Sequence, residues 1–185
     1  MTLNIRQISP VLGAIATGTD LVSGITDTMF GSLHRAWLKH NGVLVIRGEA
    51  LSHEEHIAFS RRFSELDHHV VTQFVPKEHP ALYRVSNKVG EGGDYLGNPQ
   101  AGNPWHTDNS YLDPPATVSI LYAAEVPPVG GDTLFTSMYR AYETLSPSLQ
   151  RFLEDLEAEH HFENALSNFS TFKATDGQID ATPPV

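Results

Sequence analysis

The sequence contains no cysteine, and this absence excludes disulfide scaffolds, zinc–cysteine modules, iron–sulfur ligation and thiol nucleophiles. It has no apolar run near the roughly 20 residues that a membrane span needs, and it does not begin with a signal-peptide pattern. Basic residues are scarce: 12 Lys and Arg against 22 Asp and Glu give a net charge of −10, which repels phosphate backbones and anionic membranes. We therefore expect a cytoplasmic protein that binds neither nucleic acid nor a membrane.

Further absences exclude several classes of enzyme, and the composition indicates a globular protein. The signature motifs of the commonest hydrolases, kinases, metalloproteases and dinucleotide-binding enzymes do not occur. The 185 residues are 40% hydrophobic and 18% charged, as in an ordinary globular chain, and the length suits one domain or one domain and part of another. Histidine is unusually frequent, with ten residues, and imidazole is the commonest metal ligand in proteins.

Three helices are predicted from capping signals at their amino-terminal ends. Thr26 or Thr28 can cap the first helix, and Ser52 with Glu55 forms an S-x-x-E capping box for the second. A serine followed by proline opens the third, in which apolar residues recur at helical spacing. The expected ranges are 25–41, from 53 to about 63–66, and 147–156.

Short apolar runs rich in β-branched residues predict four strands, over residues 43–46, 82–86, 117–124 and 132–136. The long segment 90–104 is rich in glycine, proline and asparagine, which predicts a loop, and long loops in small domains are often functional. Strands and helices do not alternate as regular βαβ units. The pattern favours an α+β fold with an antiparallel β core and flanking helices.

His106 and Asp108 form an H-x-D motif directly after this loop. In an extended strand, residues i and i+2 project to the same face, so one imidazole and one carboxylate could bind one metal ion. They would supply two of the three ligands of the 2-His-1-carboxylate triad of non-heme Fe(II) oxygenases. The tripeptide itself is weak support, because a chain of this composition contains one by chance about every second time.

The surroundings of the motif are much more specific, and they resemble the taurine dioxygenase family, which includes 2,4-dichlorophenoxyacetate dioxygenase and uses Fe(II) and 2-oxoglutarate. The resemblance extends over essentially the whole chain. It rests on W-H-T-D-N-S-Y over 105–111, P-P-A over 114–116, E-V-P-P over 125–128, G-G-D-T-L-F over 130–135, G-T-D-L over 18–21, V-I-R over 45–47 and R-F-S-E-L over 62–66.

The resemblance implies a double-stranded β-helix (jelly-roll) core and a role for four residues. His106 and Asp108 match the first two iron ligands, Thr133 matches a threonine whose hydroxyl helps to hold the 2-oxoglutarate carboxylate, and His69 matches a histidine that contacts the anionic group of the substrate. Without the resemblance, Thr133 would be interpreted as an ordinary strand threonine and His69 as one of a surface histidine pair.

The residues that differ from taurine dioxygenase predict a different substrate. Thr72 stands where that enzyme has a tyrosine, Gly102 or a neighbour where it has an asparagine, and Ala165-Leu166 where it has Ser-Phe. We therefore expect a small anionic substrate other than taurine: a sulfonate, a sulfate ester or a carboxylate. The implied reaction hydroxylates this substrate with O₂ and releases succinate and CO₂.

The family's second histidine ligand and the arginine that pairs with 2-oxoglutarate have no match in this sequence. We expect both beyond Val185, so that residues 1–185 form a single dioxygenase domain that is incomplete at its carboxy terminus and lacks the last strands of the core. By itself this chain would be inactive. The alternative hypothesis is a non-catalytic fragment or binding module with a broken metal site. The oligomeric state, a homo-oligomer included, stays open.

Overall fold

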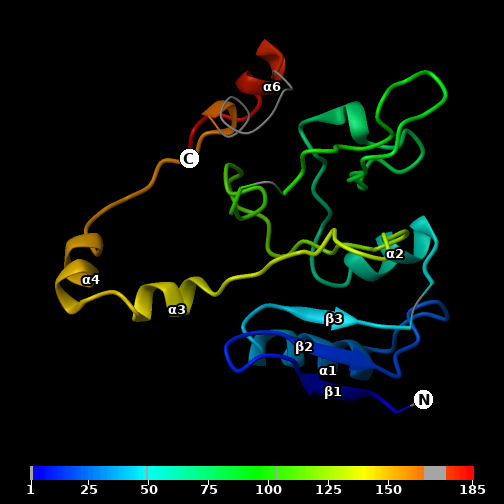
Figure 1. Ribbon diagram of the computed structural model, residues 1–185, viewed down its shortest axis with the longest axis horizontal. Coiled ribbons are helices and arrows are strands. Elements are labelled where there is room, and N and C mark those ends of the chain that lie inside the picture. Colours follow the sequence, from blue (N-terminus) through cyan, green and yellow to red (C-terminus); the bar gives the residue numbers. More distant parts are fainter. Residues whose placement is uncertain (1, 49, 103, 165–173) are drawn as a thin grey trace. The chain divides into compact units, whose positions relative to one another are not determined.

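The computed structural model describes residues 2–48, 50–102, 104–164 and 174–185. Its contacts divide the chain into two units, which are described separately: unit 1 is Met1–Arg62 with Leu121–Glu157, and unit 2 is Phe63–Ile120 with Ala158–Val185. No helix in these described ranges is long and apolar enough to cross a membrane. The elements are β1 (Asn4–Gln7), β2 (Ala14–Thr17), α1 (Asp27–Lys39), β3 (Leu44–Ile46), α2 (His53–Ser60), the 3-10 turn η1 (Thr72–Phe74), α3 (Met138–Glu143), α4 (Pro147–Leu153) and α6 (Asp176–Asp180), as Figure 1 shows.

Unit 1 contains a three-stranded sheet in the order β1-β2-β3, with α1 packed against β2 and β3 (Figure 1). Strand β1 pairs with β2 antiparallel, and β2 pairs with β3 parallel, with Ala14 opposite Leu44 and Ala16 opposite Ile46. The expected antiparallel core is therefore wrong for this sheet, which is mixed. Its parallel pair arises because α1 returns the chain to the end of the sheet where β2 began.

Small side chains form the buried centre of this sheet. Ala14 and Ala16 lie on one face of β2 and are completely buried, and Leu33 of α1 is 1% exposed. Alanines at these positions leave room for the helix to approach the strand closely. Strand β2 was not predicted, because two of its four residues are alanines and alanine is depleted in strands.

The predicted capping residues are confirmed, with Thr26 and not Thr28 at the first helix, which spans Asp27–Lys39 in place of the predicted 25–41. The Thr26 hydroxyl accepts the Met29 N–H, Ser52 and Glu55 form the full capping box, and Ser146 accepts the Leu149 N–H. The predicted end of the second helix is wrong, since α2 ends at Ser60 and not at residues 63–66. Its last turn tightens into a bond from the Arg62 N–H to the Phe59 carbonyl, and such i to i+3 bonds end a helix.

Three of the four predicted strands do not form in the structure. Residues 117–124 and 132–136 have no strand partner in the described part of the chain, and 82–86 contributes one isolated bridge, from Val85 to Asn98. A strand needs a second strand to pair with, and local sequence does not supply one. The structure thus shows a small mixed sheet with helices, while the jelly-roll core stays a prediction.

Unit 2 is held together mainly outside regular elements. The segments around Val85 and Asn98 run side by side, and a hairpin-like loop joins them through the pairing of Val89 with Tyr95. Gly97 makes this possible, because a Cβ there would lie 2.7 Å from the Ser86 backbone nitrogen and 3.0 Å from the Arg84 carbonyl oxygen. This close approach fixes the loop that precedes the H-x-D motif.

Candidate functional site

His106 and Asp108 lie together in unit 2, with 3.0 Å between His106 Nε2 and Asp108 Oδ1. Both side chains are about half exposed, at 47% and 51%, so a ligand can reach them. The expected strand context is wrong: residues 105–107 have no strand pairing and Asp108 begins a turn. The two side chains therefore meet through the turn, without the same-face geometry of a strand.

A hydrogen bond at the other ring nitrogen of His106, Nδ1, determines which nitrogen carries the hydrogen. Its Nδ1 lies 2.8 Å from the Pro104 carbonyl oxygen, and a carbonyl can only accept a hydrogen bond, so Nδ1 carries the hydrogen. In the neutral ring, Nε2 then holds a lone pair beside the Asp108 carboxylate. A cation shared by these two groups, either a proton or a metal ion, relieves their repulsion, and metal-binding histidines are commonly oriented by such a bond to a carbonyl. The pair fits a divalent metal ion.

The turn after Asp108 is fixed by its own side chains. Asn109 adopts a left-handed backbone conformation, with φ of 50°, which asparagine tolerates better than most residues. The Leu112 N–H donates to the Asn109 carbonyl, and the Tyr111 hydroxyl donates to Asn109 Oδ1 at 3.2 Å. Burial raises the pKa of Tyr111 to about 12, so this hydroxyl remains a donor at neutral pH. These contacts hold the backbone that carries Asp108.

His69 lies in the same unit, and its environment keeps the imidazole largely neutral. Burial lowers the pKa of His69, while the nearby Asp108 carboxylate acts in the opposite direction. The Val71 N–H donates to His69 Nδ1 at 3.0 Å, which leaves Nε2–H as the donor of the neutral ring. The structure therefore places a neutral hydrogen-bond donor within electrostatic range of the H-x-D carboxylate.

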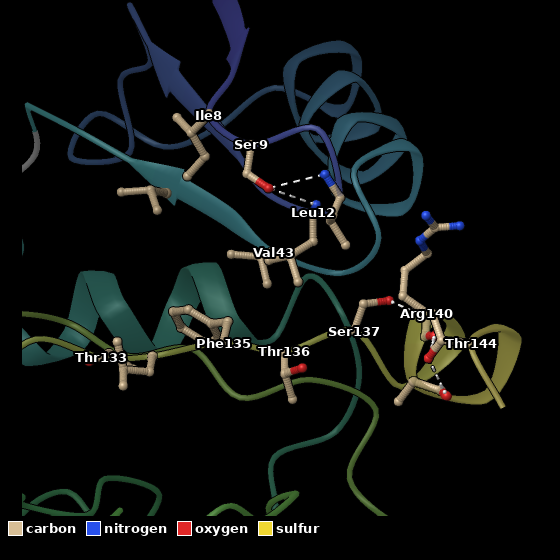
Figure 2. A pocket seen from close by; sticks show the side chains of 14 residues that line it. Ile8, Ser9, Leu12, Val43, Thr133, Phe135, Thr136, Ser137, Arg140 and Thr144 are labelled. Atoms are coloured by element: carbon tan, nitrogen blue, oxygen red, sulfur yellow. Dashed lines mark hydrogen bonds between the residues drawn. The ribbon is translucent and has the colours of Figure 1, made fainter.

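Thr133 belongs to unit 1, whereas His106 and Asp108 belong to unit 2. It lies in an extended segment without strand pairing, which corrects its expected position on a strand. There it lines a pocket of about 630 Å³ together with Val43, Val45 and Phe135 (Figure 2). The cationic group of this pocket, Arg140, is paired with Glu143 at 2.8 Å. The pocket is otherwise mainly apolar.

The remaining predicted positions add no metal ligand. The described residues contain no group of three or more His, Asp, Glu or Cys side chains that could hold a metal ion. Thr72 begins the turn η1, and Gly102 lies in the loop before the motif. Ala165 and Leu166 lie outside the described residues. Pro104, Asn98 and Tyr83 were not predicted as site residues, although the first two lie in the predicted loop 90–104 and Tyr83 in the predicted strand 82–86. Pro104 acts through its carbonyl oxygen, Asn98 through its side-chain amide and Tyr83 through its ring.

Comparison with known proteins assigns the family. The model of the family described as taurine catabolism dioxygenase TauD, TfdA matches residues 4–185. The chain belongs to this family. Members of the TauD/TfdA family are oxidoreductases that depend on Fe(II) and 2-oxoglutarate, which confirms the predicted family, cofactor and cosubstrate.

Individual TauD/TfdA relatives show how far the similarity extends. The 2,4-dichlorophenoxyacetate dioxygenase of Cupriavidus pinatubonensis is 33% identical over 195 residues, covering 100% of this chain and 67% of that protein. An alkylsulfatase of Acinetobacter baylyi is 30% identical over 85% of this chain and 47% of its own length. The crystal structure of AAD-2 in complex with Mn(II) and N-oxalylglycine matches with a TM-score of 0.70 and 23% identity, over 100% of this chain and 63% of that one.

These matches support the fold and the general chemistry of the TauD/TfdA family. The chain spans about half to two thirds of the length of the relatives named here. Both relatives named from sequence are enzymes, so the alternative of a non-catalytic binding module gains no support from them.

Proposed function

We propose that the protein is an Fe(II)- and 2-oxoglutarate-dependent dioxygenase that hydroxylates a small anionic organic molecule. The balanced reaction consumes one substrate, one O₂ and one 2-oxoglutarate, and it yields the hydroxylated substrate, succinate and CO₂. One oxygen atom enters the substrate at a C–H bond and the other enters succinate. The observation that carries this proposal is the His106–Asp108 pair, which stands in the family motif with its imidazole already oriented by Pro104.

His106 and Asp108 would hold the metal through the nitrogen and oxygen atoms that already face each other. Fe(II), when bound, supplies the redox chemistry that activates O₂. The residues of this chain hold the two metal ligands in position. The Pro104 carbonyl keeps the hydrogen of His106 on Nδ1, so that Nε2 stays available to the metal, and the turn stabilised by Tyr111 keeps the Asp108 carboxylate beside it.

Two further residues take the roles that the resemblance implies. The Thr133 hydroxyl would donate to a carboxylate oxygen of 2-oxoglutarate, and its exposed side chain is free to do so. The Nε2–H of His69 would donate to the anionic group of the substrate. One observation supports the anionic class: the named relatives act, by their names, on a carboxylate and on alkyl sulfates, which are groups that accept a hydrogen bond from such a donor.

The first test replaces a proposed metal ligand. Asp108→Ala should abolish Fe(II)-dependent succinate formation from 2-oxoglutarate in the protein of full natural length, because alanine removes both a ligand and its negative charge. Asp94→Ala, in the exposed loop of the same unit, is the matched control and should retain activity. Metal content of the two purified variants, measured after loading with Fe(II), checks the same point without turnover. Full activity of Asp108→Ala would refute the assignment.

The second test concerns the substrate. Succinate release is measured with taurine, 2,4-dichlorophenoxyacetate and a linear alkyl sulfate, each with the same concentration of 2-oxoglutarate. We expect taurine to be a poor substrate, because Thr72 stands where taurine dioxygenase has a tyrosine, and Gly102 or a neighbour stands where it has an asparagine. A clear preference for taurine would show that this interpretation of the two positions is wrong.

A further inference from the structure

The His69 ring is fixed on one face and at one nitrogen. Its plane stacks on Tyr83, with 4.0 Å between ring centroids and 17° between planes. The Val71 N–H occupies Nδ1 at 3.0 Å, and Nε2 has no hydrogen-bond partner in the described part of the chain. A stacked ring cannot turn about its side-chain bonds without losing this contact. The orientation of Nε2 is therefore set by the position of Tyr83.

Tyr83 is itself held by two contacts. The Asn98 side-chain amide donates to the Tyr83 hydroxyl at 3.1 Å, and the Phe74 ring meets the Tyr83 ring edge-on, with centroids 6.1 Å apart. Asn98 is anchored by its backbone, since its N–H donates to the Arg84 carbonyl at 2.8 Å and its carbonyl accepts the Ser86 N–H at 3.3 Å. The loop before the H-x-D motif thus supports the ring on which His69 lies.

The protonation states agree with this arrangement. Burial lowers the pKa of His69 and raises the pKa of Tyr83, so the stacked pair consists of a neutral imidazole and a neutral phenol at pH 7. A neutral imidazole whose Nδ1 accepts a hydrogen bond has its hydrogen on Nε2. The pair thus offers a ligand one directed hydrogen bond and no full positive charge.

We propose that Tyr83 is a positioning residue, whose ring, held by Asn98 and Phe74, orients the His69 imidazole so that Nε2–H donates to the anionic group of the substrate. The inference rests on the proposed function, in which His69 contacts the substrate. It extends that function by making substrate recognition depend on the loop 84–98, which supports Tyr83 through Asn98.

The test compares three variants in the protein of full natural length. Tyr83→Leu removes the stacking face, Tyr83→Phe keeps the ring and loses only the bond to Asn98, and Tyr95→Leu removes an exposed tyrosine of the same loop as a control. With 2,4-dichlorophenoxyacetate as the probe, Tyr83→Leu should raise KM about tenfold with little change in kcat. Tyr83→Phe should restore most of the affinity, and Tyr95→Leu should match the wild type.

The second readout does not depend on turnover. Two-dimensional ¹H–¹⁵N spectra of the histidine rings, with His69 assigned by His69→Gln, report which ring nitrogen carries the hydrogen. We expect the Nε2–H form of His69 in the wild type and in Tyr83→Phe, and a mixture of the two forms in Tyr83→Leu. An Nδ1–H form in the wild type overturns the proposal even if Tyr83→Leu does not fold. Unchanged KM and unchanged His69 signals in a folded Tyr83→Leu variant overturn it equally.

The two proposals fail in different ways. If the wild type forms no succinate in an Fe(II)-dependent manner, the proposed function is wrong, while the ring spectra still decide whether Tyr83 orients His69. If succinate forms normally but the spectra and KM do not respond to Tyr83→Leu, only the positioning role is wrong.

Discussion

The two units of the molecule keep their residues in place by different means. Unit 1 is stabilised by backbone pairing in the sheet β1-β2-β3 and by the packing of α1 against it. Capping residues fix where the helices α1 and α2 begin. In unit 2, the described residues 104–112 around the H-x-D motif form bends and a turn. The motif depends on a backbone contact at Gly97, a turn fixed by Asn109 and stacked rings. The comparison shows that the candidate site is carried by the part of the chain with the least regular structure, as is common for functional loops.

The substitution expected to change stability most lies in unit 1, which contains the sheet. Leu33→Ala should lower the free energy of unfolding by about 2–5 kcal/mol, because Leu33 is 1% exposed and its removal leaves a cavity between α1 and the sheet. Leu38→Ala, on the same helix at 57% exposure, is the control and should change little. Urea unfolding measures both. Equal losses in the two variants would contradict the assignment of the core.

In unit 2 the most sensitive backbone position should be Gly97. Gly97→Ala places a Cβ against the Ser86 nitrogen and the Arg84 carbonyl, which must move apart, at a cost of about 1–3 kcal/mol in the free energy of unfolding. Gly92→Ala is the matched control, because the nearest atom to its Cβ would be 3.9 Å away. Urea unfolding of the two variants tests whether an irregular loop can be as intolerant of substitution as a core. A neutral Gly97→Ala would show that it is not.

The smallest effect is a pH dependence that comes from His69. Because burial lowers the pKa of His69 in the folded protein below its ordinary value of 6.5, the unfolded chain binds the proton more readily. The wild type should therefore lose stability, relative to His69→Gln, as the pH falls below about 6.5 and towards the lower folded pKa, and the difference should be constant above that range. Melting temperatures between pH 5 and 8 measure it, with His68→Gln as the exposed control. A difference that grows on raising the pH would reverse the sign and refute the buried, neutral His69.

The difference between local contacts and contacts of distant residues explains which elements could be predicted from the sequence. The helix starts at Thr26, Ser52 and Ser146 were predicted correctly because a cap and its partner lie within three residues of each other. Strand β2 was missed because its alanines carry no strand signal, and its existence depends on a helix and two strands elsewhere in the chain. Strands depend on partners that local sequence does not show.

For the candidate site, sequence predicted residue identities better than their surroundings. The H-x-D motif identified His106 and Asp108 as candidate metal ligands. In the structure His106 Nε2 lies 3.0 Å from Asp108 Oδ1, although the two residues meet through a turn and not on a strand. The motif could not show that Tyr83 stacks on His69 or that Asn98 supports Tyr83, because these residues are separated in the sequence and meet only after the chain folds. The metal-ligand, cosubstrate and substrate roles of His106, Asp108, Thr133 and His69 stay predictions.

The parallel pairing of β2 with β3 through α1 also bears on the order in which the chain folds. It connects Ala14 with Leu44, so all residues of this sheet are present once the chain has been made up to Ile46. Unit 2 instead depends on distant contacts, such as the bond from the Gln178 side chain to the Val70 carbonyl, 108 residues apart. During synthesis the strand-helix-strand segment can therefore assemble while the rest is still being made. The bond between Gln178 and Val70 can form only late, after Gln178 has left the ribosome.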